Sequence, residues 1–211
     1  MKRLLIRADD IGYSYAVDLG IARSVNEGLV RSVGLMPNMP EAERGWSLVA
    51  DAGVAVGQHT NVCLGKPCAD PALIPSMLNE NGEFHSSRTF REHFKLGEEL
   101  IDFDEACIEI RAQHDRFVEI VGREPDYFEA HAVMSKNLNR AISAVAQELG
   151  LKEQKANFDP AAVVHCGDAD LRMVMRSMEP DYEPKEAIMQ TVREMVEGET
   201  VIFVCHPGYL D

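Results

Sequence analysis

Near its N-terminus the chain reads Leu4-Leu5-Ile6-Arg7-Ala8-Asp9-Asp10-Ile11-Gly12, and the architecture can be worked out from this segment. Its apolar run predicts a short buried strand. Two adjacent carboxylates, Asp9 and Asp10, follow at the carboxyl end of that strand. The glycine then turns the chain, and Ser14 is placed to cap a helix that begins near Tyr15.

Two interpretations of the paired carboxylates are open. Aspartate is common in turns and at helix N-caps, so Asp9 and Asp10 can serve only to shape the turn. Alternatively, a divalent cation compensates their charge and leaves one carboxylate free for proton transfer. The histidines further along the chain bear on this choice.

Strands and helices alternate along the chain. We predict strands at residues 3–8, 31–36, 54–57, 127–130 and 200–205, and helices at 14–27, 41–52, 104–121, 184–197 and one that ends at Gly150. Residues 151–183 are hard to assign, with 152–157 and 163–164 as candidates for short strands. The alternation is typical of an α/β fold with a parallel sheet and crossover helices, in which chemistry collects at the carboxyl ends of the strands.

Four strand ends carry polar candidate residues. His59, His131 and His206 follow three further apolar strands, as Asp9 and Asp10 follow the first. A single histidine after a strand is usually a satisfied structural residue, but core packing does not explain four polar strand ends on one edge. One carboxylate and two neutral imidazoles suit a divalent metal with open positions, while a spare aspartate and histidine suit a base and an acid. A metal ion, a base and an acid together can hydrolyse an amide or an ester.

Composition narrows the class of protein. The 211 residues suit one domain, which we predict to span 1–211, and 45% hydrophobic residues can fill its core. The formal net charge of -14 argues against nucleic acid and anionic membranes as partners. It does not exclude a phosphorylated substrate, because local charge in a pocket can oppose the total.

The cysteines and the N-terminus indicate a compartment. The five cysteines include no CxxC pair, which suits reduced thiols in the cytoplasm. Asp9 comes too early for a signal peptide, and no apolar run approaches the about 18 residues of a membrane span. Residues 63–103, with repeated Pro, Gly and Asn, predict a long irregular connection of the kind that forms a substrate loop or lid.

Five ordered motifs resemble those of the YdjC-like carbohydrate deacetylases, a family that includes chito-oligosaccharide deacetylases. Arg7–Gly12 resembles the N-A-D-D-F-G opening, and Arg31–Pro40 resembles the second-strand segment that ends in M-x-N-M-P. Gly57–Pro67 is similar to G-x-H-x-N-L…G-K-P, Asn79–Phe84 to D-E-N-G-x-F, and His206–Tyr209 to the closing H-P-G. The similarity covers nearly the whole chain.

The resemblance implies a distorted (β/α) TIM-like barrel, here with fewer than eight strands. It also implies metal-dependent removal of acetyl groups from small N-acetylated sugars such as chito-oligosaccharides, by hydrolysis of a C–N bond that is not a peptide bond. Carried over, Asp10, His59 and His131 would hold one divalent ion, Mg²⁺ or Zn²⁺. Asp9 would be the base and His206 the acid or a substrate contact. Asn61 would support the site or bind the sugar, and Pro207 and Gly208 are also expected to bind substrate.

Two departures from the family pattern bear on the substrate and the assembly. Many members carry a histidine cluster after the fourth strand, whereas Glu129–Met134 holds only His131, which leaves open a substrate different from that of the chitobiose-type enzymes. Members usually continue beyond H-P-G, whereas this sequence ends at Asp211. We therefore expect a short barrel and a homodimer that covers its apolar face.

Two other functions are open. The same site can hydrolyse another acylated amine, and the sequence does not separate this from sugar deacetylation because substrate residues lie on variable loops. A non-catalytic sugar- or metal-binding protein can also keep the fold. Retention of Asp9 and His206 argues against it, because metal binding alone needs neither a base nor an acid.

Overall fold

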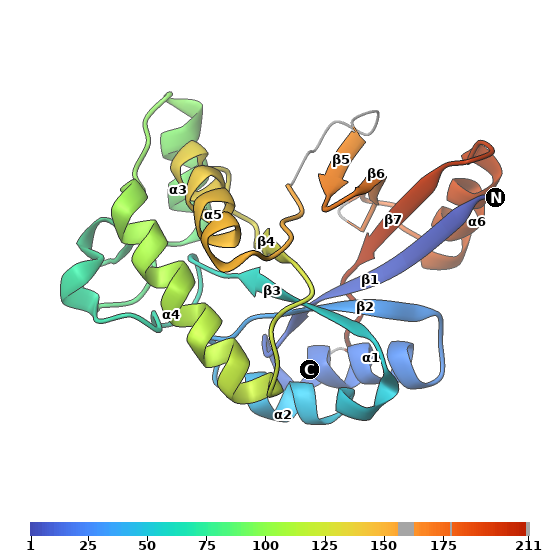
Figure 1. Ribbon diagram of the computed structural model, residues 1–211, viewed down its shortest axis with the longest axis horizontal. Coiled ribbons are helices and arrows are strands. Elements are labelled where there is room, and N and C mark those ends of the chain that lie inside the picture. The colour runs from blue at the N-terminus through green and yellow to red at the C-terminus, as the bar shows by residue number, and fades with distance from the viewer. Residues whose placement is uncertain (156–162, 178, 210–211) are drawn as a thin grey trace.

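One curled, seven-stranded sheet organises the chain, with strand order β4-β3-β2-β1-β7-β6-β5 (Figure 1). The computed structural model describes residues 1–155, 163–177 and 179–209. In chain order the helices and strands are β1 (Arg3–Ile11), α1 (Tyr15–Asn26), β2 (Val30–Leu35), α2 (Ala42–Ser47), the 3₁₀ turn η1 (Ala50–Ala52), β3 (Ala55–Thr60), η2 (Pro71–Leu73), η3 (Pro75–Met77), α3 (Ser87–Lys95), α4 (Phe103–Val121), β4 (Phe128–Ala130), α5 (Lys136–Leu149), β5 (Val163–Cys166), β6 (Ala169–Met175), α6 (Pro184–Glu194) and β7 (Thr200–Cys205).

β1 lies at the centre of this sheet. It pairs in parallel with β2 on one side and with β7 on the other. Parallel pairing continues from β2 to β3 and β4, and from β7 to β6, whereas β5 pairs antiparallel to β6. The arrangement confirms the expected α/β class and forms a distorted TIM-like barrel with fewer than eight strands.

Two apolar clusters hold the helices on the sheet. The first joins β1, β2, β3 and β7 to α1 and α2, and includes Ile21, Trp46 and Phe203. The second joins α4 and α5 to the 63–103 segment, and includes Met77 and Leu138. Each large apolar side chain buried in this way contributes about 1.5–3 kcal/mol. The clusters therefore fix the strands that carry the candidate site residues.

Two strands extend further than predicted. β1 continues to Ile11 and β3 to Thr60, so Asp9, Asp10 and His59 lie inside strands, whereas His131 and His206 directly follow theirs, as predicted. The extension of β1 follows from Ile11, which is only 1% exposed and pairs with Leu35 after a register shift beyond Ala8. β1 thus remains paired with β2, and the two aspartates lie at the register shift between Ala8 and Ile11.

Two other predictions from sequence are wrong in part. The helix predicted at 41–52 ends at Ser47, whose hydroxyl donates to the Arg44 carbonyl at 2.6 Å and competes with helical bonding. The 63–103 segment is not irregular throughout, because Ser86 caps α3 and Phe90 anchors it. In the 151–183 region, Val163 and Val164 lie in β5, as considered, and the candidate strand at 152–157 lies partly outside the described residues. β6 was not predicted, because its partial exposure blurs its alternation.

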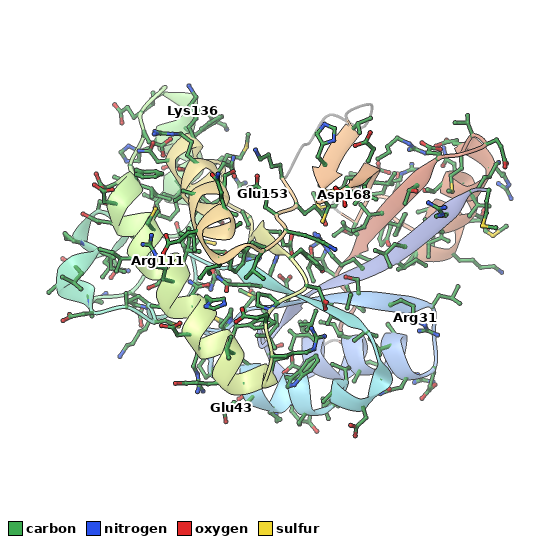
Figure 2. All side chains as sticks on the ribbon, in the orientation of Figure 1. Arg31, Glu43, Arg111, Lys136, Glu153 and Asp168 are labelled. Atoms are coloured by element: carbon green, nitrogen blue, oxygen red, sulfur yellow. The ribbon has the colours of Figure 1, made fainter. Side chains whose placement is uncertain are left out.

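Charged side chains cover the outer helices. Figure 2 labels three of them: Glu43 on α2, Arg111 on α4 and Lys136 at the start of α5. Within the described ranges, none of the helices combines the length and the apolar composition that crossing a bilayer requires.

Candidate metal centre

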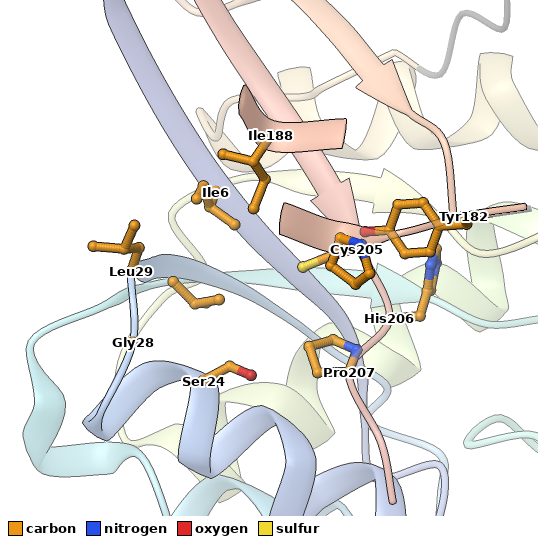
Figure 3. Close-up of a pocket in the computed structure, with 11 residues that line it drawn as sticks. Ile6, Ser24, Gly28, Leu29, Tyr182, Ile188, Cys205, His206 and Pro207 are labelled. Atoms are coloured by element: carbon orange, nitrogen blue, oxygen red, sulfur yellow. The ribbon is translucent and has the colours of Figure 1, made fainter. Parts of the chain in front are cut away.

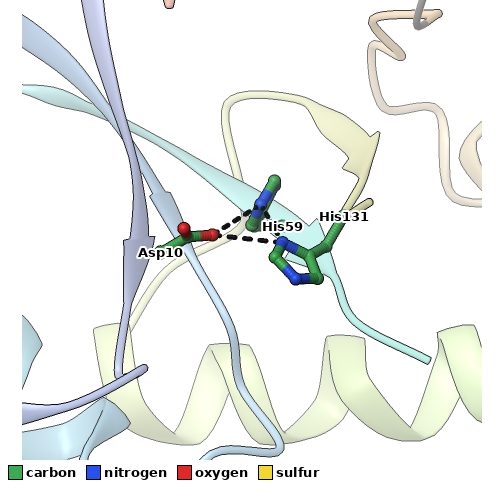
Figure 4. A group of neighbouring side chains, drawn as sticks. All are labelled: Asp10, His59 and His131. Atoms are coloured by element: carbon green, nitrogen blue, oxygen red, sulfur yellow. Dashed lines mark hydrogen bonds and ion pairs between the residues drawn. The ribbon is translucent and has the colours of Figure 1, made fainter. Parts of the chain in front are cut away.

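Asp10, His59 and His131 converge on one point (Figure 4). Oδ1 of Asp10 lies 3.1 Å from Nε2 of His59 and 3.1 Å from Nδ1 of His131. The two imidazole nitrogens are 2.9 Å apart. The residues come from β1, from β3 and from the position after β4. Three side chains singled out in the sequence thus meet in space.

Backbone strain is concentrated beside these candidate ligands. In the described part of the chain, the non-glycine residues with positive φ are Asp10 at 80° and Ala132 at 49°. A left-handed conformation of this kind costs about 1–3 kcal/mol and persists where the surroundings fix it, often at functional sites. One of the two is a candidate ligand, and the other directly follows His131.

The surroundings of Asp10 favour the ionised form of its side chain. Burial opposes its charge, but hydrogen bonds with His131 and His59 hold the pKa of Asp10 well below its ordinary value. For His59, burial lowers the pKa, but the carboxylates of Glu129 and Asp9 outweigh it and raise the pKa well above the ordinary value. Ligation of a metal ion would require this imidazole in its neutral form.

The donor atoms fit a single divalent ion. Neighbouring donors on an octahedral ion with bonds of about 2.1 Å lie about 3.0 Å apart. The three observed separations are 2.9, 3.1 and 3.1 Å. Two imidazoles and one carboxylate also form a donor set that transition metals favour. Both spacing and chemistry thus suit a metal centre.

A buried ionic layer lies behind the candidate ligands, and sequence reasoning missed most of it. Nδ1 of His59 lies 2.7 Å from Oε1 of Glu129, whose other oxygen is 2.8 Å from the Arg7 guanidinium. Arg7 also donates to Oδ2 of Asp9 at 2.7 Å and to Gln154 at 2.9 Å. Two signals were available: Arg7 lies two residues before Asp9, on the same strand face, and Glu129 stands two before His131.

Gly34 on β2 makes room for this layer. A Cβ atom there would lie 2.9 Å from Oδ1 of Asp9 and 2.9 Å from Oε1 of Glu129. Real Cβ atoms do not approach other atoms so closely, so a side chain at this position would displace both carboxylates. The lack of space beside Asp9 and Glu129 therefore explains why the second-strand motif has a glycine at position 34.

A pocket of about 310 Å³ opens onto the same residues. It is lined by Asp9, His59, His131 and His206, together with Arg91 of α3 and the methionines Met134, Met173 and Met175. His206 is exposed, and its Nδ1 lies 2.8 Å from the Ser177 hydroxyl. The predicted base and acid thus border one cavity together with two of the candidate ligands, His59 and His131.

Three expected substrate residues lie elsewhere. Asn61 is fully buried, and its amide donates to Asn38 at 3.0 Å and to the Leu64 carbonyl at 2.9 Å, which fixes the loop after β3. Pro207 borders a second cavity, of about 330 Å³, between β1, β7, α1 and α6 (Figure 3). Gly208 packs against Gly20 of α1. None of the three lines the pocket that contains His59.

Comparisons with known proteins agree with this architecture. Residues 3–211 match the family described as YdjC-like protein. A carbohydrate deacetylase of Geobacillus stearothermophilus is 29% identical over 214 residues, which cover 98% of this chain and 80% of that protein. A chitooligosaccharide deacetylase of Serratia marcescens is 27% identical over 224 residues, covering 100% and 83%. A solved structure from Enterococcus faecalis V583 has a TM-score of 0.82 at 26% identity, covering 100% of this chain and 82% of that one. Since the family match spans nearly every residue, the chain belongs to the YdjC-like protein family.

Proposed function

We propose that this protein is a metal-dependent deacetylase that releases acetate from small N-acetylated sugars such as chito-oligosaccharides. The observation that carries the proposal is the convergence of Asp10, His59 and His131 beside a pocket that also contains Asp9 and His206. The names of the two deacetylase relatives support the carbohydrate substrate.

The residues divide the reaction among them. A divalent ion, Mg²⁺ or Zn²⁺, held by Asp10, His59 and His131 supplies Lewis acidity toward the amide carbonyl oxygen. Asp9 accepts a proton from the water that attacks the carbonyl carbon. His206 donates a proton to the amine nitrogen as the C–N bond breaks. One water is consumed, and acetate and the free amine are released.

The remaining predicted residues have supporting roles in this proposal. Asn61 holds the loop after β3, and Pro207 and Gly208 hold the chain that carries His206. The 63–103 segment serves as the substrate loop of a single domain spanning 1–211, in keeping with Arg91 at the pocket.

Acetate release from N-acetylglucosamine oligomers tests the proposal. We expect wild-type protein to release acetate only with added divalent metal, and Asp9→Asn to be slower by about 10²–10⁴-fold, the usual contribution of a general base. Asp51→Asn, at an exposed aspartate of η1, is the matched control and should keep wild-type activity. Folded, metal-binding wild type that releases no acetate would contradict the sugar substrate.

Another acylated amine is the second candidate substrate. Three methionines line the pocket, and the described lining residues include no aromatic ring of Phe, Tyr or Trp on which a sugar could stack. Methionine adapts to apolar groups of varied shape. Acetate or other acid released from non-sugar N-acyl amines, but not from the oligomers, would favour this candidate.

We also propose a homodimer in the cytoplasm. Met189 and Val192 on α6 and Val196 just beyond it expose apolar surface that a second subunit can cover. All five cysteines are free, which suits a reducing compartment. Light scattering on the purified protein measures the mass, and a monomer at micromolar concentration would contradict the dimer.

A further inference from the structure

Two groups of potential metal ligands share His59. Its Nε2 atom faces Asp10 and His131, and its Nδ1 atom faces Glu129. His59 forms a second set with Asp9 and Glu129, and the ligand atoms of each set lie within 4.8 Å of one another. Either set has the composition of a divalent-metal site, so something must decide between them.

The guanidinium of Arg7 occupies the second set. Its Nε lies 2.7 Å from Oδ1 of Asp9, and its terminal nitrogens lie 2.7 Å from Oδ2 of Asp9 and 2.8 Å from Oε2 of Glu129. Gln154 accepts a further bond at 2.9 Å. Arg7 is only 3% exposed. A guanidinium keeps its charge and spans two carboxylates with a rigid fork, so it stands where a cation would otherwise be needed.

We propose that Arg7 is a positioning residue that closes the Asp9–His59–Glu129 set to metal ions and commits the ion to Asp10, His59 and His131. A metal ion at the second set and the guanidinium would compete for the same two carboxylates, because Arg7 contacts both oxygens of Asp9 and Oε2 of Glu129, whose Oε1 faces His59. With Arg7 in place, Glu129 stays on Nδ1 of His59 and directs Nε2 toward the first set. The inference rests on the metal site of the proposed function and is independent of the substrate.

Replacement of Arg7 by an uncharged side chain tests this directly. Arg7→Met keeps a long unbranched chain and removes the charge. Zn²⁺ is titrated calorimetrically into chelator-treated wild type and variant, and anomalous diffraction locates the bound ions. In wild type we expect one Zn²⁺ per chain, at Asp10, His59 and His131. In the variant we expect an ion at Asp9, His59 and Glu129. A folded variant with one Zn²⁺ at the first set and wild-type affinity would overturn the proposal.

A double variant supplies the matched control. Arg7→Met with Glu129→Gln removes one cation and one anion, so the buried charge stays balanced, and it also removes a donor from the second set. We expect this variant to bind one Zn²⁺, at the first set only. An ion that still appears beside Asp9 in this control would show that the second set is not what Arg7 closes.

A conservative variant keeps the test decisive where Arg7→Met does not fold. Lysine carries its charge on one nitrogen and cannot span both carboxylates, so Arg7→Lys should lower the Zn²⁺ affinity of the first set by about 10–100-fold, the usual effect of losing an outer partner. Wild-type affinity in folded Arg7→Lys would overturn the proposal.

Binding is measured without substrate, which separates this inference from the proposed deacetylation. Wild type that binds one Zn²⁺ but releases no acid from any acylated amine contradicts the enzyme activity and leaves the role of Arg7 standing. Wild type that binds no Zn²⁺ contradicts the metal site, and the role of Arg7 with it.

Discussion

Each candidate ligand is held by a different local constraint. Asp10 is fixed by a backbone conformation with φ of 80°. His59 is fixed through its ring by Glu129, and His131 through its backbone N–H, which donates to the Thr60 carbonyl at 3.0 Å. Because β3 thus positions two of the three ligands, small changes at one residue should be felt at the others.

Loss of one ligand should weaken ion binding strongly. We expect His131→Ala to lower Zn²⁺ affinity by more than the about 10–100-fold that loss of an outer partner causes, because a direct donor is removed. Titration calorimetry measures this. His85→Ala is the control, since His85 packs edge-on against Phe90 of α3, away from the ligands. Equal affinities in the two variants would exclude His131 as a ligand.

The space at Gly34 should be essential for stability and for Zn²⁺ binding. Gly34→Ala places a Cβ 2.9 Å from the carboxylate oxygens of Asp9 and Glu129, so we expect it to lower the free energy of unfolding by about 1–3 kcal/mol and to weaken Zn²⁺ binding. Urea denaturation gives the first quantity. Gly208→Ala is the control, because its Cβ would meet Val17 at an ordinary 3.5 Å. Wild-type stability of Gly34→Ala would contradict the packing described here.

The buried thiol of Cys63 should make stability depend on pH. Burial raises the pKa of Cys63 to about 12, whereas an unfolded thiol ionises near pH 8.5. The native state therefore holds more protons between these values, and stability present below the lower value is lost as pH rises. We expect the difference in unfolding free energy between wild type and Cys63→Ala to fall by about 2 kcal/mol from pH 8 to pH 10. An unchanged difference in urea denaturation would contradict this.

For single residues, the sequence predicted the candidate ligands at the strand ends but not the buried charged residues that contact them. Asp10, His59 and His131 are visible because each is a polar residue that ends or follows an apolar run. Arg7 and Glu129 were missed because their role depends on the pairing of β3 with β4, in which His59 stands opposite Glu129. That register is set by three residues of β4 and cannot be read from local pattern.

Among the elements, α5 follows closely after the candidate ligand His131, because it starts at Lys136. Its N-cap, Ser135, accepts from the Leu138 N–H at 3.0 Å and donates to Glu99 at 2.6 Å. Glu99 also accepts from the backbone N–H of Lys136 at 2.8 Å. The segment between α3 and α4 thus secures the helix that follows the ligand.

Removal of this cap should destabilise the protein. We expect Ser135→Ala to lower the free energy of unfolding by about 1–2 kcal/mol, at the upper end for an N-cap, because Glu99 loses its partner as well. Ser86→Ala is the control: Ser86 caps α3 at an exposed position, and its loss should cost less. Chemical denaturation of both variants measures the difference, and a larger loss in Ser86→Ala would contradict the assignment.

Elements with strong periodicity were predictable, and those that depend on distant partners were not. α4 lies within one residue of its predicted bounds because its apolar stripe and Gly122 are local signals. β6 was missed because it is half exposed on both sides, and it exists as a strand through its pairing with β7 and β5.

For the whole molecule, ion binding should stabilise the fold, because the ligands come from distant parts of the chain that only folding brings together. At a free Zn²⁺ concentration about 100 times the dissociation constant, the gain is about 2.7 kcal/mol, which raises Tm by about 5–11 °C for a chain of this size. Calorimetry with and without chelator measures the shift. Asp10→Asn should show little of it, and a full shift in that variant would place the ion elsewhere.

The central position of β1 has a consequence for biosynthesis. All three candidate ligands have left the ribosome once residue 131 has emerged, and β1 to β4 are neighbours in the sheet. On the proposed metal site, a nascent chain would therefore be able to bind an ion during translation, before β7 and His206 exist. Until β7 arrives, the other edge of β1 is an unpaired strand that invites aggregation. Chaperones that shield nascent chains should thus matter most for this protein during synthesis of its last third.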